Sequence, residues 1–376
     1  MTSQTAVTAV TAVSGQTAVT AVSAQTAVTA VTAVTAVQGT QPTAGIHSGV
    51  TSAALLTASD SVSGYWTPVE NPPAHRAFGK AEHLGEWSQT IRLIVLGGRM
   101  AARLSVNAHK DDTCSIAIRR RADGSGAAST LGTIKRPDEA FFAQQCNIIA
   151  SHADLRADRM AEIISQAGDP LAHLAAVVGL SPGRMRHVYE LLALVQSFAT
   201  SAVLATKHTM ACRRPDAYSA QIQPVLPTPG HGAFPSGHAT ESFAMATVLS
   251  QLFSGKAGIN EQLMGHAARI AINRTVAGLH FPADSTAGAM LGIALGQAFI
   301  AMCTGKQEVQ PGTFEAKADK GGLDFEASDY TSLDPLKENA AINDLVSLSK
   351  ALPEGEIKSD PMLSWLWDLA VKESTR

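Results

Sequence analysis

Residues 229–238 read "PGHGAFPSGH" and are followed by the largely apolar run "ATESFAMATVLSQLF". Because Pro, Ser and Gly stand just before this run, the pattern predicts a helix that begins near His238. The first backbone N–H groups of a helix have no internal partner and carry partial positive charge. An entrance made of Ser236 and Gly237 lets an oxyanion approach these groups closely, with the serine hydroxyl as an extra donor. The stretch therefore predicts an anion-binding cup; a plain N-cap with a glycine hinge is the simpler interpretation.

Two cations precede this stretch on a second predicted helix. That helix should have Ser181 as its N-cap and Pro182 at its first position, and it must stop by Pro215. Lys207 and Arg214 are seven residues apart, about 700° of helical rotation, so both side chains leave nearly the same face. The preceding turns are rich in Leu, Val, Ala and Phe, and a buried helix rarely carries unpaired cations. We therefore expect the two cations to face a buried anion rather than solvent.

The third informative stretch, "NRTVAGLHFPADSTAG", lies downstream. Gly278 is a natural helix end and Pro282 a natural helix beginning. This places Arg274 in the last turn of one helix, His280 in the connection and Asp284 in the first turn of the next helix. Asp284 can accept a hydrogen bond from one imidazole nitrogen of His280, which raises the basicity of the other nitrogen. A nitrogen prepared in this way is a nucleophile or a ligand.

Together the three stretches can direct the cations Lys207, Arg214 and Arg274, and two histidines, to one point. Three fixed cations suit a multiply charged tetrahedral or trigonal-bipyramidal oxyanion, which offers enough oxygens and charge to satisfy them. A divalent metal would be repelled. The pattern therefore argues against a dinuclear metal hydrolase, which needs more carboxylates and fewer cations.

These residues follow one another in a fixed order: Lys207-x6-Arg214-Pro215, Pro235-Ser236-Gly237-His238, and Arg274-x5-His280-x3-Asp284. The order resembles the three-part signature of the type 2 phosphatidic acid phosphatase and vanadium haloperoxidase superfamily. The resemblance runs from Lys207 to Asp284 and leaves the first 135 residues uncovered. Asn273 stands where the family usually has Ser, a departure that touches only the fine geometry of the site.

The resemblance implies a mainly α fold, a helical bundle of the haloperoxidase and acid phosphatase type with the site in its core. In the family's phosphatases the position of His280 attacks phosphorus to form a phosphohistidine. The position of His238 protonates the leaving alcohol and later activates water, and that of Asp284 orients the nucleophile. In the haloperoxidases the same cup holds vanadate; the His280 position ligates vanadium, and His238 is the acid–base residue. One scaffold serves both because vanadate resembles the five-coordinate state of phosphoryl transfer.

His231 favours the haloperoxidase. Vanadium bromoperoxidases resemble this sequence in having a His seven residues ahead of the His in the Pro-Ser-Gly-His motif. A solvated loop histidine is the simpler interpretation. We expect a vanadate cofactor, with hydrogen peroxide and a halide as substrates. The alternative is a soluble phosphatase that needs no cofactor and hydrolyses phosphate monoesters, and a third possibility is a scaffold with an inactive site.

Composition limits the partners of the chain. The formal net charge of the 376 residues is -3, which gives no basic excess for nucleic acid. The four cysteines are far apart, and no basic, Leu-rich signal sequence opens the chain, so a cytoplasmic location is expected.

The apolar run from Thr286 to Cys303 approaches the length of a membrane span. Its Gly and Ala content favours a packed internal helix, so no membrane span is expected.

We expect four segments along the chain. Residues 1–47 include nine copies of Thr-Ala-Val, whose period of three fits neither helix nor strand, and should be disordered. Residues 48–135 form a mixed region, in which Thr113 to Ile134 could be a hairpin and "WSQTIRLIVLGGRMAARL" a helix or a strand. Residues 136–303 form the helical catalytic domain, starting with an N-cap at Asp138. Residues 304–376 form a polar extension in which only the amphipathic helix over residues 360–373 should be ordered, packed through Trp365 and Leu369.

Overall fold

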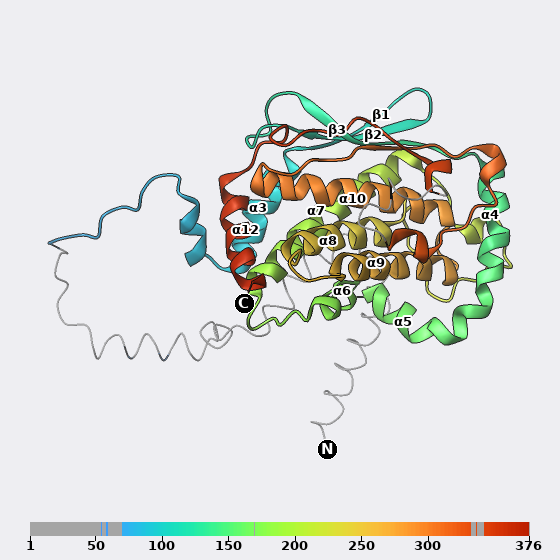
Figure 1. The fold of residues 1–376 in the computed structure, drawn as a ribbon, viewed down its shortest axis with the longest axis horizontal. Coiled ribbons are helices and arrows are strands. Elements are labelled where there is room, and N and C mark those ends of the chain that lie inside the picture. Colours follow the sequence, from blue (N-terminus) through green and yellow to red (C-terminus); the bar gives the residue numbers. More distant parts are fainter. Residues whose placement is uncertain are drawn as a thin grey trace, which may run out of the picture.

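A computed structural model describes residues 70–168, 170–331 and 342–375, together with residues 54, 58 and 336. The predicted disorder of the Thr-Ala-Val repeat falls outside these residues. At the centre lie α7 (Arg186–Met210), α8 (Gly237–Leu252), α9 (Ile259–Val276) and α10 (Pro282–Thr304). Figure 1 shows these four helices across the middle of the molecule, where α8 packs against the other three. The starts of α8 and α10 and the end of α9 agree with the sequence prediction.

A stripe of glycines on α10 brings it into direct contact with α8. A Cβ atom on Gly292 would lie 2.5 Å from the carbonyl oxygen of Thr240 on α8. A Cβ on Gly288 or Gly296 would lie within 2.8 Å of α8 atoms. Only glycine therefore allows the two backbones to approach this closely. The contact holds the start of α8 beside the start of α10, where Ser236 N donates to Asp284 O at 2.8 Å.

The remaining helices surround this centre. They are α3 (Gln89–Ala101), α4 (Glu139–Ser151), α5 (Arg156–Gly168), α6 (Pro170–Val178) and α12 (Pro361–Ser374). Asp138 caps α4 as predicted, accepting from Phe141 N at 2.7 Å. The terminal helix α12 packs on α7, as Figure 1 shows. Its buried apolar face is formed by Leu363, Leu366, Trp367 and Ala370. Trp365 is partly buried and packs against the core as predicted, whereas Leu369 is only partly buried.

Both ends of α7 differ from the prediction. Ser181 and Pro182 do not start the helix, because Ser181 O accepts from Met185 N at 2.8 Å in a separate turn. The helix begins at Arg186 and ends at Met210, after which Ala211 has a left-handed backbone with φ of 52°. Arg214 therefore lies in an extended segment beyond the helix, with φ -78° and ψ 159°. The expectation that Lys207 and Arg214 share one helix face is wrong.

A five-stranded mixed sheet lies beside α10 (Figure 1). Its strands, in spatial order, are β1 (Leu104–Ala108), β2 (Thr113–Arg119), β3 (Ala128–Lys135), β4 (Gly312–Phe314) and β5 (Val346–Leu348). The predicted hairpin is confirmed as β2 and β3, which are antiparallel. The ambiguous stretch before it forms α3 followed by β1. β3 and β4 are parallel neighbours, with Gly132 opposite Gly312.

The sheet qualifies the predicted fold class. The described chain is mainly α, as expected, but it also contains the mixed sheet, and the haloperoxidase type of bundle stays a prediction. The expectation that only the terminal helix is ordered after residue 304 is wrong, because β4 and β5 also come from that region. The four-segment division stays a prediction, although one sheet joins strands from both sides of the catalytic domain.

Two helices of the described chain are long and apolar enough to cross a membrane. They are the segment Arg186–Ala217, whose most apolar window is 61% buried in the protein, and Pro282–Thr304, with 94% buried. The core helix of a soluble protein has the same length and composition. The expected absence of a membrane span therefore stays a prediction.

Candidate functional site

Most of the predicted site residues meet at a small cavity of about 50 Å³. A water molecule needs about 10–15 Å³ of such space, so the cavity has room for about four oxygen-sized atoms. It lies where the starts of α8 and α10 approach the ends of α5 and α9. The predicted residues that line it are Arg214, His231, Gly237, His238, Arg274 and His280. Lys207, Ser236 and Asp284 lie behind its wall.

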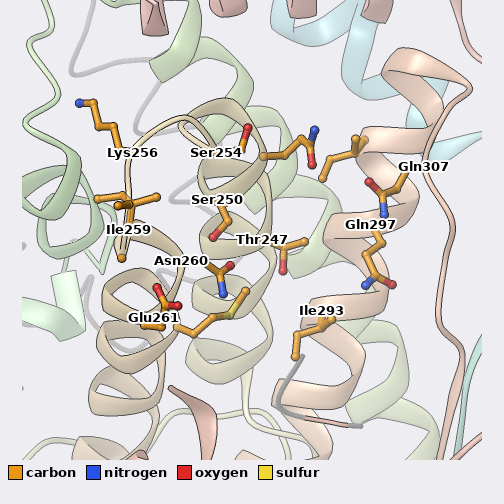
Figure 2. A pocket seen from close by; sticks show the side chains of 15 residues that line it. Thr247, Ser250, Ser254, Lys256, Ile259, Asn260, Glu261, Ile293, Gln297 and Gln307 are labelled. Carbon is orange, nitrogen blue, oxygen red and sulfur yellow. The ribbon is translucent and has the colours of Figure 1, made fainter. Parts of the chain in front are cut away.

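A larger cavity of about 380 Å³ lies elsewhere, between the second half of α8, the start of α9 and α10. Figure 2 shows its hydroxyl and amide side chains, among them Thr247 and Ser250 from α8, Asn260 from α9 and Gln297 from α10. None of the described residues that line it is a predicted site residue. The volume of a cavity therefore does not identify the candidate site in this fold. We place the site at the smaller cavity, which is lined by cations.

Lys207 lies in the last turn of α7 and supports the cavity from behind. Its Nζ donates to the carbonyl oxygens of Gly232 at 2.9 Å and Ala233 at 2.6 Å. Gly232 approaches α7 closely, since a Cβ there would lie 3.3 Å from Lys207 O. Burial, and then the charge of Arg214, hold the pKa of Lys207 well below its usual value. Lys207 thus fixes the loop that carries His231.

Arg214 reaches the cavity from the extended segment after α7. Its Nη1 donates to Leu279 O at 2.9 Å and lies 2.9 Å from His280 Nε2. Its Nε donates to His231 O, and its Nη2 lies 3.2 Å from His231 Nδ1. Burial lowers the pKa of Arg214 to about 10, so the guanidinium stays charged at pH 7. Burial, with Lys207 and Arg214, lowers the pKa of His231 to about 4, so this imidazole is neutral.

His280 and Asp284 form the predicted pair, with Nδ1 2.7 Å from Oδ2. Because a guanidinium can only donate, the His280 Nε2 beside Arg214 Nη1 must carry a lone pair. The proton is therefore on Nδ1 and is donated to Asp284. Burial and the neighbouring cations hold the pKa of His280 well below its usual value. Burial raises the pKa of Asp284 to about 7. The lone pair of a neutral histidine thus borders the cavity.

The start of α8 supplies the second histidine. The Ser236 side chain accepts from Ala239 N, so its hydroxyl acts as a plain N-cap, while Gly237 lines the cavity. His238 is partly buried and is hydrogen-bonded to the backbone of Gln166. Burial, and then Arg274, hold the pKa of His238 well below its usual value. At neutral pH His238 is therefore a free base beside the cavity.

Arg274 carries the clearest signal of an anion. It lies in the last turn of α9, as predicted, and only 1% of it is exposed. Its Nη2 donates to Ile163 O at 2.9 Å, but Nε and Nη1 have no hydrogen-bond partner among the described residues. Buried donors are nearly always satisfied, so two orphaned N–H groups on a buried cation need an explanation. An oxyanion in the adjoining cavity would satisfy both.

Sequence analysis missed two residues at the site. Glu241 lines the cavity, and its position three residues after His238 on one helix face was a usable signal. Gln166 acts through its backbone, which leaves no signal in the sequence. Asn273, which stands where the family usually has Ser, donates from Nδ2 to the Gln166 side chain at 2.9 Å. Among the described residues, no group of three or more His, Cys, Asp or Glu could hold a metal ion.

Residues 188–307 match the family model described as the PAP2 superfamily. The matched range begins in α7, ends just after α10 and contains all nine predicted site residues. No curated protein matches the chain.

Proposed function

We propose that the protein is a vanadate-dependent haloperoxidase. Residues 188–307 match the PAP2 superfamily, whose members are generally phosphatases or haloperoxidases. The family accounts for an oxyanion-binding function of either type. The observation that favours the haloperoxidase is the place of His231, which lines the cavity together with His238 and His280. A histidine at this position is the feature by which the sequence resembles vanadium bromoperoxidases.

The residues present fit vanadate. Arg274 offers two buried N–H donors without partners, and the cavity of about 50 Å³ has room for the oxygens of one oxyanion. Arg274, Arg214 and the start of α8 at Gly237 would hold the oxygens, and His280 Nε2 would be the vanadium ligand. Bound vanadate would supply the centre at which hydrogen peroxide oxidises a halide.

The chain's own groups prepare the site for this reaction. Asp284 keeps the His280 proton on Nδ1, so that Nε2 presents its lone pair to the cavity. Arg214 Nη1 lies 2.9 Å from that lone pair, so Arg214 must turn toward the anion when His280 acts as a ligand. His238 is neutral at pH 7 and can accept a proton from incoming hydrogen peroxide.

A phosphatase is the second candidate, and the His280–Asp284 pair favours it. A neutral imidazole whose Nδ1 lies 2.7 Å from a carboxylate is arranged as a nucleophile. His238 would first take up a proton together with the anionic ester. His280 Nε2 would then attack phosphorus, and the ester P–O bond would break as His238 gives that proton to the leaving alcohol. His238 would then activate water to release phosphate from His280. This candidate needs no cofactor.

One paired assay separates the two candidates. Purified full-length protein, with and without orthovanadate, is given hydrogen peroxide, bromide and a phenol-type dye, and separately nitrophenyl phosphate. We expect vanadate-dependent bromination, weak phosphate release and loss of bromination in His231→Ala. Phosphatase turnover inhibited by vanadate, without halide oxidation, would reverse the order of the candidates. If neither reaction occurs and His280→Ala leaves the affinity for vanadate unchanged, the protein is an inactive scaffold.

A further inference from the structure

Glu241 is a carboxyl group in a cavity built for an anion. It lies on α8, is 3% exposed and lines the same cavity as Arg214, Arg274 and the three histidines. Its carboxyl accepts hydrogen bonds from two neutral groups on α7, Thr200 Oγ1 at 3.0 Å and Gln196 Nε2 at 3.4 Å. Among the described residues, none forms an ion pair with it within 4.0 Å. The geometry thus holds Glu241 at the wall without neutralising its charge.

An ionised Glu241 conflicts with the anion that the rest of the cavity attracts. Two like charges about 5 Å apart, at an effective dielectric constant of about 20, repel strongly enough to weaken binding roughly a hundredfold. A protonated carboxyl group avoids this repulsion and adds one O–H donor. We propose that Glu241 belongs to the oxyanion site as an uncharged carboxylic acid, which donates a hydrogen bond to the bound anion. This inference rests on the oxyanion-binding function proposed above.

The proton of Glu241 links anion binding to pH. Burial raises the pKa of Glu241 to about 7, while Thr200, Gln196 and the charge of Lys207 oppose the rise. If only the protonated form accepts the anion, the affinity falls with the protonated fraction, roughly tenfold from pH 6 to pH 8. Other titratable or charged groups border the cavity or lie just behind it, so the effect of Glu241 must be isolated by substitution. They are Lys207 from α7, Arg214 and His231 from the loops, His238 from α8, Arg274 from α9, and His280 and Asp284 around the start of α10.

Sulfate is the probe, because it stays a dianion from pH 6 to pH 8. Its affinity is measured by calorimetry on wild-type protein and Glu241→Gln, which keeps the shape of the side chain and cannot ionise. We expect equal affinity within about threefold at pH 6 and about tenfold tighter binding by Glu241→Gln at pH 8. In buffers of different ionisation enthalpy at pH 8, the wild type should take up about one proton more per sulfate than the variant.

Two further variants complete the test. Thr200→Val removes a hydrogen bond that lowers the pKa of Glu241, so the loss of sulfate affinity should move to higher pH. Glu315→Gln removes a carboxylate from the surface pair with Lys135 and should leave the pH dependence of sulfate affinity unchanged. If Glu241→Gln weakens sulfate binding equally at both pH values, or keeps the wild-type pH dependence, the role of Glu241 is wrong. If wild-type protein binds neither sulfate nor vanadate at pH 6, the proposed oxyanion function fails as well.

Discussion

Arg274→Met separates the anion-binding role of Arg274 from a structural one. The substitution keeps an unbranched side chain in a fully buried position at the end of α9 and removes the guanidinium. The two N–H groups without partners are lost, together with the single hydrogen bond to Ile163 O. If Arg274 stabilises the fold, the variant should be less stable than the wild type. If Arg274 binds the anion, the variant should no longer bind it.

The structure gives the size of both effects. A hydrogen bond to a charged group contributes about 1.5–3 kcal/mol, so losing two weakens oxyanion binding by about 3–6 kcal/mol, roughly 10²–10⁴-fold in Kd. Burial lowers the pKa of Arg274 from 12.5 to about 10, so the buried charge costs the ligand-free fold about 3 kcal/mol. Leaving Ile163 O without a partner costs about 1–3 kcal/mol. We therefore expect the free energy of unfolding of the ligand-free variant to equal or exceed the wild-type value by up to about 2 kcal/mol.

The assay is urea unfolding with and without orthovanadate. At a concentration of about 100 times the wild-type Kd, vanadate should stabilise the wild type by about 2.7 kcal/mol and the variant by less than about 0.5 kcal/mol. Arg269→Met is the matched control, since Arg269 lies on the same helix and pairs with Glu162 at 2.9 Å away from the cavity. It should change stability by less than about 1 kcal/mol and keep the vanadate effect. A destabilised Arg274→Met protein with a wild-type response to vanadate would refute the reasoning.

Three further predictions follow from the same geometry. Asp284→Asn should lower vanadate affinity about 10- to 100-fold, because the group that orients His280 loses its charge; unchanged affinity in vanadate titrations would contradict this. His231 has its pKa lowered to about 4 by burial, so the folded protein binds fewer protons than the unfolded chain between pH 4 and 6.5. Its contribution to stability is therefore lost as the pH falls through that window. The free energy of unfolding of His231→Gln should drop less than that of the wild type from pH 6.5 to 4.5, and an equal drop would contradict this prediction. Gly292→Ala should destabilise the protein by about 1–3 kcal/mol in thermal unfolding because its Cβ meets Thr240 O, whereas Gly98→Ala on α3, with no atom near its Cβ, should gain about 0.4–1 kcal/mol.

The elements that sequence predicted best are those with local stop and start signals. Ser236 before α8, Gly278 after α9 and Pro282 at the start of α10 fix helix boundaries within a few residues. The position of His280 between two such boundaries made its contact with Asp284 predictable. The order of the motifs also allowed us to predict that these side chains lie close together, because they stand at or near helix ends.

Other features depend on contacts that no local pattern records. Ser181 and Pro182 resemble a helix start, yet the turn that they form ends before α7 begins. α7 ends without glycine, through a left-handed Ala211, so the extended path of Arg214 had no signal. Strands of three residues, such as β4 and β5, show no periodicity and are fixed only by pairing with distant strands. The partners of Glu241 also come from another helix.

Because β3 and β4 pair in one sheet, the segment that matches the family model is smaller than the folded unit. The matched residues 188–307 include neither strand. A fragment cut to that range would expose the side of α10 that β3 and β4 cover. It would also lose Gln145 of α4, whose Oε1 accepts from Ala283 N at the start of α10. The family match covers about a third of this chain, but the shape of the candidate site is maintained by residues on both sides of that third, so expression and mutagenesis need at least residues 70–375.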